Sequence, residues 1–205
     1  MKLLIATKNP GKLKEMQNFL GDDFELVSLA DFPDAPEVHE TGPTFYENAV
    51  LKAKAYFRWS GIASVADDGG LEIYALNGEP GVYSRRWPTP EEHASGQMRE
   101  KTDDELIDLA LTKLHGVADR FAQLRVVGAY YDGMHILTAA GCIDGAIVTE
   151  RPLSCEKGYP FRSIFLVPKF GKLFKDLTAQ EHEAVNHRRA VYSKLRELIL
   201  AKVSV

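Results

Sequence analysis

Two adjacent carboxylates, Asp67 and Asp68, stand at the end of a predicted buried strand and precede Gly69 and Gly70. Bare acids there repel each other and resist desolvation, so a positive charge is expected beside them. The end of such a strand is where open α/β sheets hold ligands, and the two glycines permit a turn that aims both carboxylates at one point. Carboxylate oxygens suit Mg²⁺, which binds alongside substrate phosphates. The alternative interpretation is an exposed Asp-Asp-Gly-Gly turn.

The stretch TKNPGK, residues 7–12, offers groups that bind phosphate. It ends a short predicted strand and begins a helix, so backbone N–H groups at the helix start can face an anion. Hydroxyl, amide and ammonium groups come from Thr7, Asn9, Lys8 and Lys12. The two-glycine spacing of a Walker A loop is missing. An ordinary Asn-Pro-Gly turn with solvated lysines is the alternative.

Charged residues also surround the start of the next predicted helix. Glu40 lies in a loop just before Thr44, which can cap the helix, and Glu47 and Lys52 occupy the first turns. A capping box with Thr44 is enough to explain Glu47, and a surface position is enough to explain Lys52. Glu40 has no structural role that the sequence reveals.

Basic side chains gather at two later places. Arg85 and Arg86 follow a Pro-Gly turn, and His182, His187 and Arg188 lie in the last predicted helix. A solvated face is the usual fate of such charge. Together with the carboxylates and lysines, these residues predict a Mg²⁺-dependent enzyme acting on a nucleoside triphosphate.

Strands and helices alternate along the chain and must position these groups. Apolar periodicity predicts a helix over residues 12–20, a helix over 44–60 ended by Gly61, and a helix over 103–114 capped by Thr102. A last helix is predicted from about Ala179 to Lys202. The pattern favours α/β or α+β with a long antiparallel section. The predicted strands are 2–7, 24–29, 62–67, 71–76, 122–132, 134–144 and 146–152, with Gly133 and Gly145 as turns.

Composition narrows the function further. The 205 residues carry a formal net charge of −4, which argues against a broad nucleic-acid-binding surface. Only Cys142 and Cys155 are present, too few for a disulfide framework and without metal-ligand spacing. No apolar run approaches the roughly 18 residues of a membrane span. We therefore expect a cytoplasmic protein with no membrane or nucleic-acid partner.

Three motifs in order carry a resemblance to a known family. TKNPGK, ETGPTFYENAVLKAKA and ADDGGLEIYALNGEPGVYSRR resemble the Ham1/inosine triphosphate pyrophosphatase family, the non-canonical purine NTP pyrophosphatases. The family patterns are Thr-x-Asn-x-x-Lys, Glu-Thr-Gly-x-Thr-Phe-x-Glu-Asn-Ala, and Ala-Asp-Asp-Ser-Gly-Leu followed by Gly-x-Pro-Gly-x-x-Ser-x-Arg. The similarity extends over essentially the whole chain, and the second and third motifs are long enough to be highly specific.

The resemblance implies a single ITPase-like domain over 1–205, with two lobes around a central cleft and a central mixed sheet flanked by helices. It implies a Mg²⁺-dependent homodimer that cleaves the α–β bond of ITP, dITP or XTP, releasing monophosphate and pyrophosphate. Asp68 would be the catalytic base, and Glu40, Asp68 and Asp67 would serve the metal. The implied substrate-binding residues are Thr7, Lys8, Asn9, Lys12, Lys52, Gly69, Arg86, Phe161, Arg162, His182, His187 and Arg188.

The chain departs from the family pattern where the base is read. Gly69 replaces a serine, which removes a hydroxyl but keeps the backbone N–H. Where the family has Gly-Phe-Gly-Tyr-Asp-Pro-Ile-Phe, this chain has GYPFRSIF, so Arg162 replaces an aspartate and turns an acceptor into a donor. His182 replaces a lysine and Asn186 a serine, whereas His187 and Arg188 match. We therefore expect an altered base preference.

Two other functions stay open. The protein could keep the fold and bind nucleotide without efficient turnover, although the intact Glu40, Asp68, Lys12 and Lys52 favour an enzyme. It could also act as a Maf-type pyrophosphatase on modified pyrimidine or methylated nucleotides. One candidate for a dimer interface is the apolar stretch AQLRVVGAYY, residues 122–131.

Overall fold

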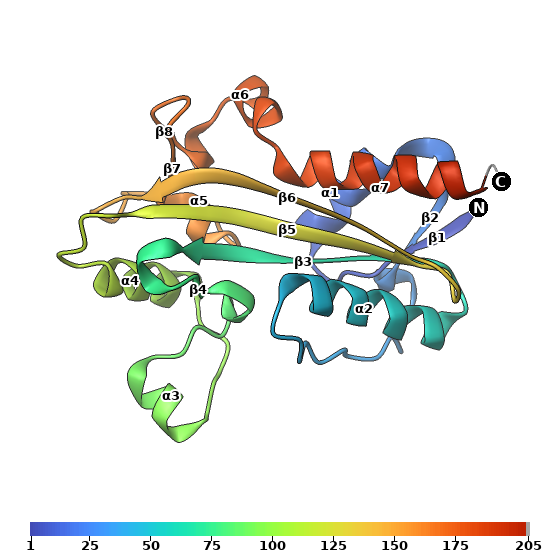
Figure 1. The fold of residues 1–205 in the computed structure, drawn as a ribbon, viewed down its shortest axis with the longest axis horizontal. Coiled ribbons are helices and arrows are strands. Elements are labelled where there is room, and N and C mark those ends of the chain that lie inside the picture. Colours follow the sequence, from blue (N-terminus) through green and yellow to red (C-terminus); the bar gives the residue numbers. More distant parts are fainter. Residues whose placement is uncertain (204–205) are drawn as a thin grey trace. The chain divides into compact units, whose positions relative to one another are not determined.

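The computed structural model describes residues 1–203, which form two compact units (Figure 1). Unit 1 contains residues 1–69, 126–141 and 187–203, and unit 2 contains 70–125 and 142–186. Each unit buries its own hydrophobic core. Leu3, Met16 and Tyr192 belong to the core of unit 1, and Leu71, Trp87 and Phe165 to that of unit 2.

Unit 1 packs helices on both faces of a mixed sheet. Strand β1 (Lys2–Ile5) pairs in parallel with β2 (Glu25–Ser28) and with β3 (Ser64–Ile73). Helices α2 (Phe45–Ser60) and α7 (His187–Val203) lie on opposite sides of these strands (Figure 1). The remaining elements are α1 (Pro10–Leu20), the 3-10 turns Gly21–Asp23 and Leu29–Asp31, and the unit-1 parts of β5 (Phe121–Tyr131) and β6 (Ile136–Ile147).

Unit 2 is built on the other parts of the three long strands. Its part of β3 pairs antiparallel with β4 (Glu79–Pro80), and its part of β6 pairs antiparallel with β7 (Phe165–Val167). Hydrogen bonding follows the order β2-β1-β3-β5-β6-β7-β8. The other elements are η3 (Tyr74–Leu76), η4 (Gly81–Tyr83), α3 (Pro90–Ser95), α4 (Asp103–Lys113), α5 (Pro160–Ile164), β8 (Lys172–Leu173), η5 (Phe174–Asp176) and α6 (Ala179–Ala184).

The helices follow the sequence predictions closely. The side chain of Thr44 accepts a hydrogen bond from the Glu47 N–H, and α2 ends at Gly61, whose φ of 70° is left-handed. The expected capping box at Thr44 is incomplete, because the Glu47 carboxylate accepts from the Thr44 hydroxyl instead of the backbone. At α4 the predicted cap Thr102 forms a full capping box with Glu105. Local signals therefore set these helix ends.

Two predicted turns are wrong, because both strands continue through them. β3 runs unbroken through Gly69 and Gly70, and β6 runs through Gly145. A Cβ at Gly70 would collide with the Ser84 hydroxyl, and one at Gly145 would collide with the Phe165 ring. These glycines therefore allow close packing within unit 2 and do not reverse the chain.

Two further expectations need correction. The last predicted helix is two helices, because α6 ends at Ala184 and α7 begins at His187. Thr178 and Glu181 form a capping box at the start of α6, a signal present in the sequence. The stretch 122–131 lies in β5, which pairs on both sides within the chain and buries most of its side chains. It therefore serves the core and is a poor interface candidate.

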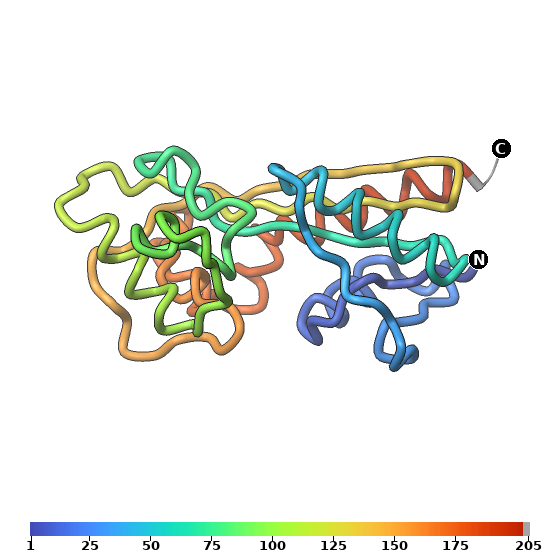
Figure 2. Tube along the Cα trace, turned by 90° about the horizontal axis from the view of Figure 1, so that it is seen from below, coloured from blue at the N-terminus to red at the C-terminus, as the bar shows by residue number. Residues whose placement is uncertain are grey.

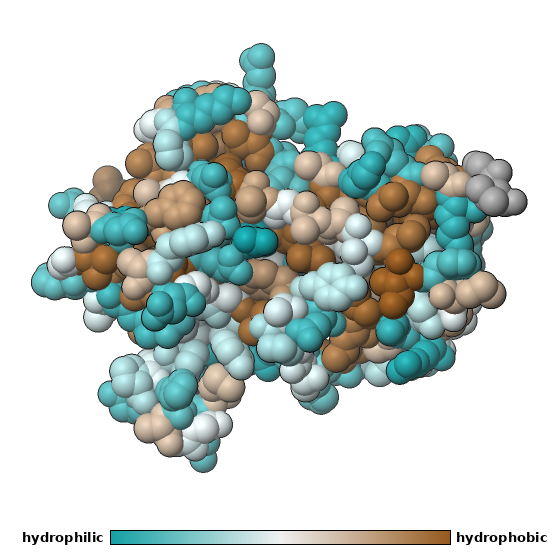
Figure 3. Space-filling model, in the orientation of Figure 1, coloured by the Kyte–Doolittle hydropathy of each residue, from teal (hydrophilic) through white to brown (hydrophobic). Residues whose placement is uncertain are grey.

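Several surface features lie on or next to α2. The loop before α2 returns along that helix (Figure 2), where Tyr56 Oη donates to the Pro36 carbonyl at 3.1 Å. Apolar side chains are exposed among polar ones over α2 (Figure 3). Within residues 1–203, every helix is too short or too polar to cross a lipid bilayer. A shallow pocket of about 350 Å³ on α2 is lined by Tyr46, Glu47, Val50, Leu51, Lys54, Ala55 and Arg58.

Candidate functional site

The turn after β1 is an N-capped helix start, as its sequence predicts. The Asn9 side chain accepts hydrogen bonds from the N–H groups of Gly11 (2.9 Å) and Lys12 (3.2 Å), and Pro10 occupies the first helical position. Thr7 Oγ1 accepts from the Asn9 N–H at 3.2 Å. Lys8 is exposed, with its ammonium 3.4 Å from the Ala35 carbonyl. The turn is thus rigid and presents cationic and hydroxyl groups at one helix end.

Lys12 turns inward from this helix and meets Asp67. Its Nζ donates to Asp67 Oδ1 at 3.0 Å, and Arg188 Nη1 donates to Oδ2 of the same carboxylate. The side chain of Asp67 is 2% exposed and that of Arg188 is 9% exposed. Both oxygens of Asp67 are therefore engaged by buried cations supplied by α1 and α7.

These partners decide the charge state of the buried cluster. Burial opposes ionisation of Asp67, but Lys12 and Arg188 outweigh it and hold the pKa of this carboxyl well below its usual range. Burial lowers the pKa of Lys12 despite the attraction of Asp67. Arg188 Nη1 also donates to Tyr192 Oη at 3.3 Å, and burial raises the pKa of that phenol well above its ordinary value. At neutral pH Asp67 is an anion and Tyr192 a neutral phenol.

Asp68 belongs to a second cluster, around Lys52. Lys52 Nζ lies 2.6 Å from Glu40 Oε1 and 3.6 Å from Asp68 Oδ1. Asn48 secures the loop that carries Glu40, because its buried Oδ1 accepts from the Gly42 N–H at 2.7 Å. One ammonium therefore lies against two carboxylates that come from a loop and a strand.

The charges of the cluster around Lys52 are not fully paired. Burial raises the pKa of Asp68 above its ordinary value, and Glu40 adds to the rise, against a lowering by Lys52. Burial opposes the charge of Lys52, but Asp68 and Glu40 keep its pKa above the ordinary value. Among the described residues, Asp68 Oδ2 is buried and has no hydrogen-bond partner. That oxygen is open to a second cation or a proton donor, and the Asn48 side chain, whose buried Nδ2 also lacks a partner, lowers the pKa of Asp68.

The carboxylate oxygens of this cluster therefore fit a hard cation that keeps part of its hydration shell. Carboxylate oxygens of Asp68 and Glu40 are the ligand type that Mg²⁺ prefers, and Mg²⁺ retains waters or phosphate oxygens at its other positions. Within residues 1–203 no group of three or more His, Cys, Asp or Glu could hold a metal alone. Two protein carboxylates with an orphaned oxygen suit a metal brought in with a phosphate ligand.

The expectation that both aspartates aim at one point is wrong. Because β3 is extended at this place, consecutive side chains point to opposite faces of the sheet. Asp67 faces Lys12 and Arg188, whereas Asp68 faces Lys52 and Glu40. Gly69 follows them in the same strand. The pair thus divides into one fully neutralised carboxylate and one available carboxylate.

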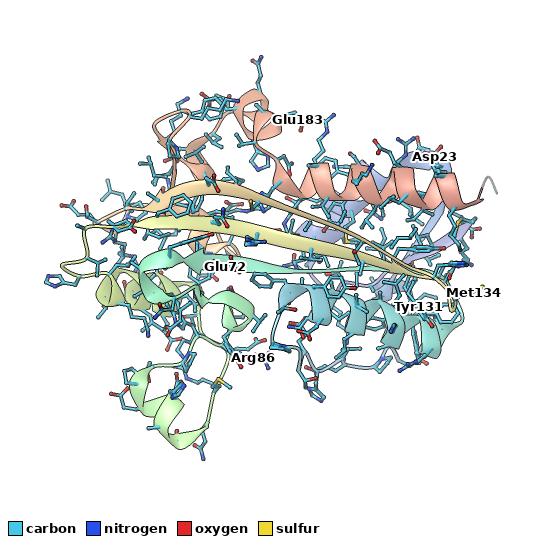
Figure 4. All side chains as sticks on the ribbon, in the orientation of Figure 1. Asp23, Glu72, Arg86, Tyr131, Met134 and Glu183 are labelled. Atoms are coloured by element: carbon cyan, nitrogen blue, oxygen red, sulfur yellow. The ribbon has the colours of Figure 1, made fainter. Side chains whose placement is uncertain are left out.

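Unit 2 carries the predicted residues Arg86, Phe161, Arg162 and His182. Arg86 lies in the segment between η4 and α3, labelled in Figure 4. Among the described residues its guanidinium has no ion pair or hydrogen bond, whereas Arg85 Nη1 donates to Asp103 Oδ1 at 2.7 Å. The Trp87 ring next to them is buried and donates from Nε1 to Glu79 Oε2 at 2.9 Å. Arg86 is thus an available cation on an anchored segment.

The positions that the family resemblance assigns to the base form an aromatic and cationic cluster in unit 2. The Arg162 guanidinium lies 3.9 Å from the Tyr159 ring centroid and 5.1 Å from that of Phe174, and the His182 ring meets Phe174 edge-on at 4.9 Å. Phe161 is only 7% exposed and packs against Trp87 in the core. Arg162 and His182 thus share Phe174 as a neighbour, whereas the Phe161 ring belongs to the core.

The late basic motif is divided by the break between α6 and α7. His182 lies in α6 of unit 2, whereas His187 and Arg188 are buried at the start of α7 in unit 1. Sequence reasoning missed Glu15, whose Oε2 lies 3.5 Å from Arg188 Nε, and Tyr192. A signal existed, because Glu15 follows Lys12 by three residues and Tyr192 follows Arg188 by four, which places each pair on one helix face.

Comparisons with known proteins show the family of the chain. The model of the Ham1 family matches residues 3–198. A "dITP/XTP pyrophosphatase" of Exiguobacterium sp. is 41% identical over 203 residues, covering 98% of this chain and 97% of that protein. The solved Ham1 protein of Staphylococcus aureus has a TM-score of 0.83 at 30% identity and covers 98% of this chain and 100% of its own. A solved nucleoside-triphosphatase, named dITP/XTP pyrophosphatase, of Mycobacterium abscessus has a TM-score of 0.74 at 35% identity, over 93% and 96% of the chains. The chain belongs to the Ham1 family.

Proposed function

We propose that the protein is a Mg²⁺-dependent nucleoside triphosphate pyrophosphatase. It cleaves the α–β phosphate bond of non-canonical purine nucleotides such as ITP, dITP and XTP, giving monophosphate and pyrophosphate. The observation that carries the proposal is the pair of carboxylates, Asp68 and Glu40, around one lysine, with a buried Asp68 oxygen that lacks a partner. Relatives named dITP/XTP pyrophosphatase over nearly the full chain support the substrate class.

Asp68 and Glu40 would hold Mg²⁺. When bound, the metal would neutralise charge that develops on the phosphates. Asp67, which the sequence assigned to the metal, has both oxygens engaged by Lys12 and Arg188. We assign it the supporting role of fixing these two cations, because a carboxylate bound twice by buried cations has little capacity left for a third.

Asp68 is assigned as the base that takes a proton from the attacking water. Its unpartnered Oδ2 offers the accepting atom, and its raised pKa favours proton uptake over that of an ordinary surface carboxylate. Lys52 lies next to Asp68, is kept charged, and would bind the triphosphate. Asp68 would thus accept the proton, and Lys52 would bind the substrate.

The remaining residues are assigned by position. Thr7, Lys8, Asn9 and Lys12 would hold phosphate at the start of α1, with the Gly69 N–H and Arg86 as further donors. Arg162, His182, His187 and Arg188 would read the base, and Phe161, which is buried, would support them. A donor-only Arg162 favours a base edge rich in acceptors, so the base preference of this chain is expected to differ from the family pattern.

We propose one ITPase-like domain over residues 1–205 that works as a homodimer. On α2 the exposed Tyr46 and the half-buried Val50 and Leu51 support an interface there better than β5 does, because β5 is paired on both sides within the chain. Light scattering behind size exclusion would give the mass directly. A monomer at micromolar concentration would refute the dimer and leave the activity untouched.

A second function has a specific observation in its favour. Arg162, stacked on Tyr159, and His182 replace the family's base-reading aspartate and lysine, as expected of a Maf-like substrate or of a binder without efficient turnover. We rank these alternatives second. A protein that binds nucleotide without turnover, in particular, has little need for Asp68 and Glu40.

Pyrophosphate release across a panel of triphosphates tests the proposal. The panel contains ITP, dITP, XTP, the eight canonical triphosphates, and methylated and oxidised forms, each with Mg²⁺. We expect pyrophosphate from ITP, dITP or XTP at a kcat/KM at least tenfold above that for ATP and GTP. Turnover confined to modified pyrimidines would support the Maf-like alternative, and silence across the panel would support the binder.

A further inference from the structure

Asp103 joins two segments of unit 2 that are far apart in the sequence. It is the first residue of α4, and its Oδ1 accepts from Arg85 Nη1 at 2.7 Å. Its Oδ2 accepts from the backbone N–H of Gly158 at 2.6 Å. One carboxylate therefore ties the segment that carries Arg86 to the turn that precedes Arg162.

The first segment is held so that Arg86 has little freedom at its backbone. The Arg85 carbonyl accepts from the Lys101 N–H at 3.0 Å, and the Arg86 N–H donates to the Tyr83 carbonyl at 2.7 Å. The Lys101 side chain is 3% exposed and pairs with Glu92. Arg85 is thus fixed at its backbone by Lys101 and at its side chain by Asp103.

The second segment transmits the position of Gly158 to Arg162. The Tyr159 N–H donates to the Glu156 carbonyl at 3.1 Å, and the Glu156 N–H donates to the buried Ser163 hydroxyl at 2.8 Å. The Arg162 guanidinium lies over the Tyr159 ring. A shift of Gly158 would therefore move Tyr159 and the guanidinium stacked on it.

A purely structural role as a helix cap does not explain these bonds. Thr102 and Glu105 already form the capping box of α4. The neighbouring Asp104 supplies the same charge to the helix end, but it pairs with Arg151 and its side chain is 73% exposed. Arg85 and Gly158 together keep the pKa of Asp103 below its ordinary value against the effect of burial. The carboxylate is thus committed to the two segments.

We propose that Asp103 is a positioning residue that couples the Arg86 segment to the Arg162 segment, so that the phosphate contact and the base contact of unit 2 form together. The inference rests on the proposed function, which assigns Arg86 to the triphosphate and Arg162 to the base. It predicts that the triphosphate group and the base are recognised cooperatively and that this cooperativity passes through one carboxylate.

Steady-state kinetics with full-length variants test the coupling. With the best substrate of the panel, Asp103→Ala should raise KM about tenfold while kcat changes less than threefold, because a binding arrangement is lost and the base Asp68 is untouched. Asp103→Asn keeps an acceptor for Gly158 and should recover part of the loss. Asp104→Asn, the matched control at the next residue, should leave both constants unchanged.

A double-mutant cycle gives the readout that a structural defect would not produce. In the otherwise native chain, we compare the fold-loss in kcat/KM of the double variant Arg86→Ala/Arg162→Ala with the product of the fold-losses of the two single variants. The loss of the double variant should be at least threefold smaller than that product. In the Asp103→Ala background, the loss of the double variant should equal the product. Multiplicative losses in both backgrounds, or an Asp103→Ala protein with native KM, would overturn the proposal.

Hydrogen exchange separates this outcome from failure of the proposed function. Without nucleotide, Asp103→Ala should speed exchange in peptides covering residues 84–87 and 156–162, and Asp104→Asn should not. A native chain that turns over no triphosphate would refute the proposed function, and the exchange result would still decide whether Asp103 holds the two segments. Unchanged exchange at both segments would contradict the coupling whatever the activity.

Discussion

Asp67 in unit 1 and Arg86 in unit 2 show two ways of presenting charge. Asp67 is buried in a strand and contacts two cations from helices, so its charge is fixed by tertiary structure. Arg86 lies on a segment between short helical turns, and its guanidinium has no partner among the described residues. The cluster around Asp67 is thus balanced within the protein, whereas Arg86 offers charge that a ligand must balance.

This difference separates the residues proposed for the phosphate chemistry from those proposed to select the base. In unit 1, Lys12, Lys52 and Asp68 lie on α1, α2 and β3, where regular hydrogen bonding leaves little room for change, whereas Glu40 lies in a loop. The departures Arg162 and His182 come from short helices of unit 2. Because loops and short helices tolerate substitution, the base preference can change while the phosphate chemistry is kept.

The largest expected effect breaks the chemistry and spares the fold. Asp68→Asn removes the proposed base and should lower kcat about 10³-fold, within the range usual for a general base. The thermal midpoint should stay the same or rise, because a buried carboxyl with a raised pKa is replaced by a neutral amide. Glu47→Gln, a carboxylate at the start of α2, is the control and should retain activity. Near-normal turnover of Asp68→Asn would falsify the assignment of the base.

The next effect tests whether the balanced cluster is a structural unit. Asp67→Asn removes the anion that the half-buried Lys12 and the buried Arg188 share, leaves Arg188 with Glu15, and should lower the free energy of unfolding by about 3 kcal/mol. Urea denaturation measures this, with the exposed Asp34→Asn as control. A loss below 0.5 kcal/mol, roughly that of a surface substitution, would show that the cluster relaxes and that the contrast between the units is small.

Arg86→Ala should weaken substrate binding and leave stability nearly unchanged, the opposite of Asp67→Asn. We expect KM for the best triphosphate to rise about tenfold, since one charge-assisted contact is lost, while the free energy of unfolding changes by less than about 0.5 kcal/mol. Kinetics and urea denaturation on the same preparation check both parts. A large loss of stability with unchanged KM would place Arg86 in the fold and not in substrate binding.

The smallest effect is a pH dependence of stability in unit 2. Arg85 and Gly158 keep the pKa of Asp103 below its unfolded value of 3.8, against burial, so its ionisation stabilises the folded state above that pH. This contribution is lost as pH falls through the folded pKa. The urea midpoints of the native chain and Asp103→Asn should therefore differ at pH 7 and converge below about pH 4. A difference that grows on acidification would have the wrong sign.

The sequence predicted what local signals and motif spacing determine. Thr44 and Gly61 bound α2 as expected, and Thr102 caps α4. It failed at Gly70 and Gly145, where a local turn signal competes with a tertiary requirement for close packing that only the folded chain reveals. The same limit hid the division of Asp67 from Asp68, because opposite faces follow from an unbroken strand.

For the site, residue types were easier to predict than their partners. Lys12, Lys52 and Arg188 were identified as cations, but the sequence alone did not show which carboxylate each one meets. Phe161 was expected at the base and lies buried against Trp87, since the helix α5 turns its ring into the core. Long-range partners such as Arg188 and Asp67 depend on the packing of α7 against β3, which no local pattern encodes.

The most direct test of the central claim follows nucleotide binding and pyrophosphate formation together while Mg²⁺ is titrated into the native protein with ITP and with XTP. We expect turnover to appear only with Mg²⁺ and to yield pyrophosphate and monophosphate, and chelation with EDTA to abolish it. Tight binding that is indifferent to Mg²⁺ and forms no product would contradict the claim and identify a nucleotide-binding protein without efficient turnover.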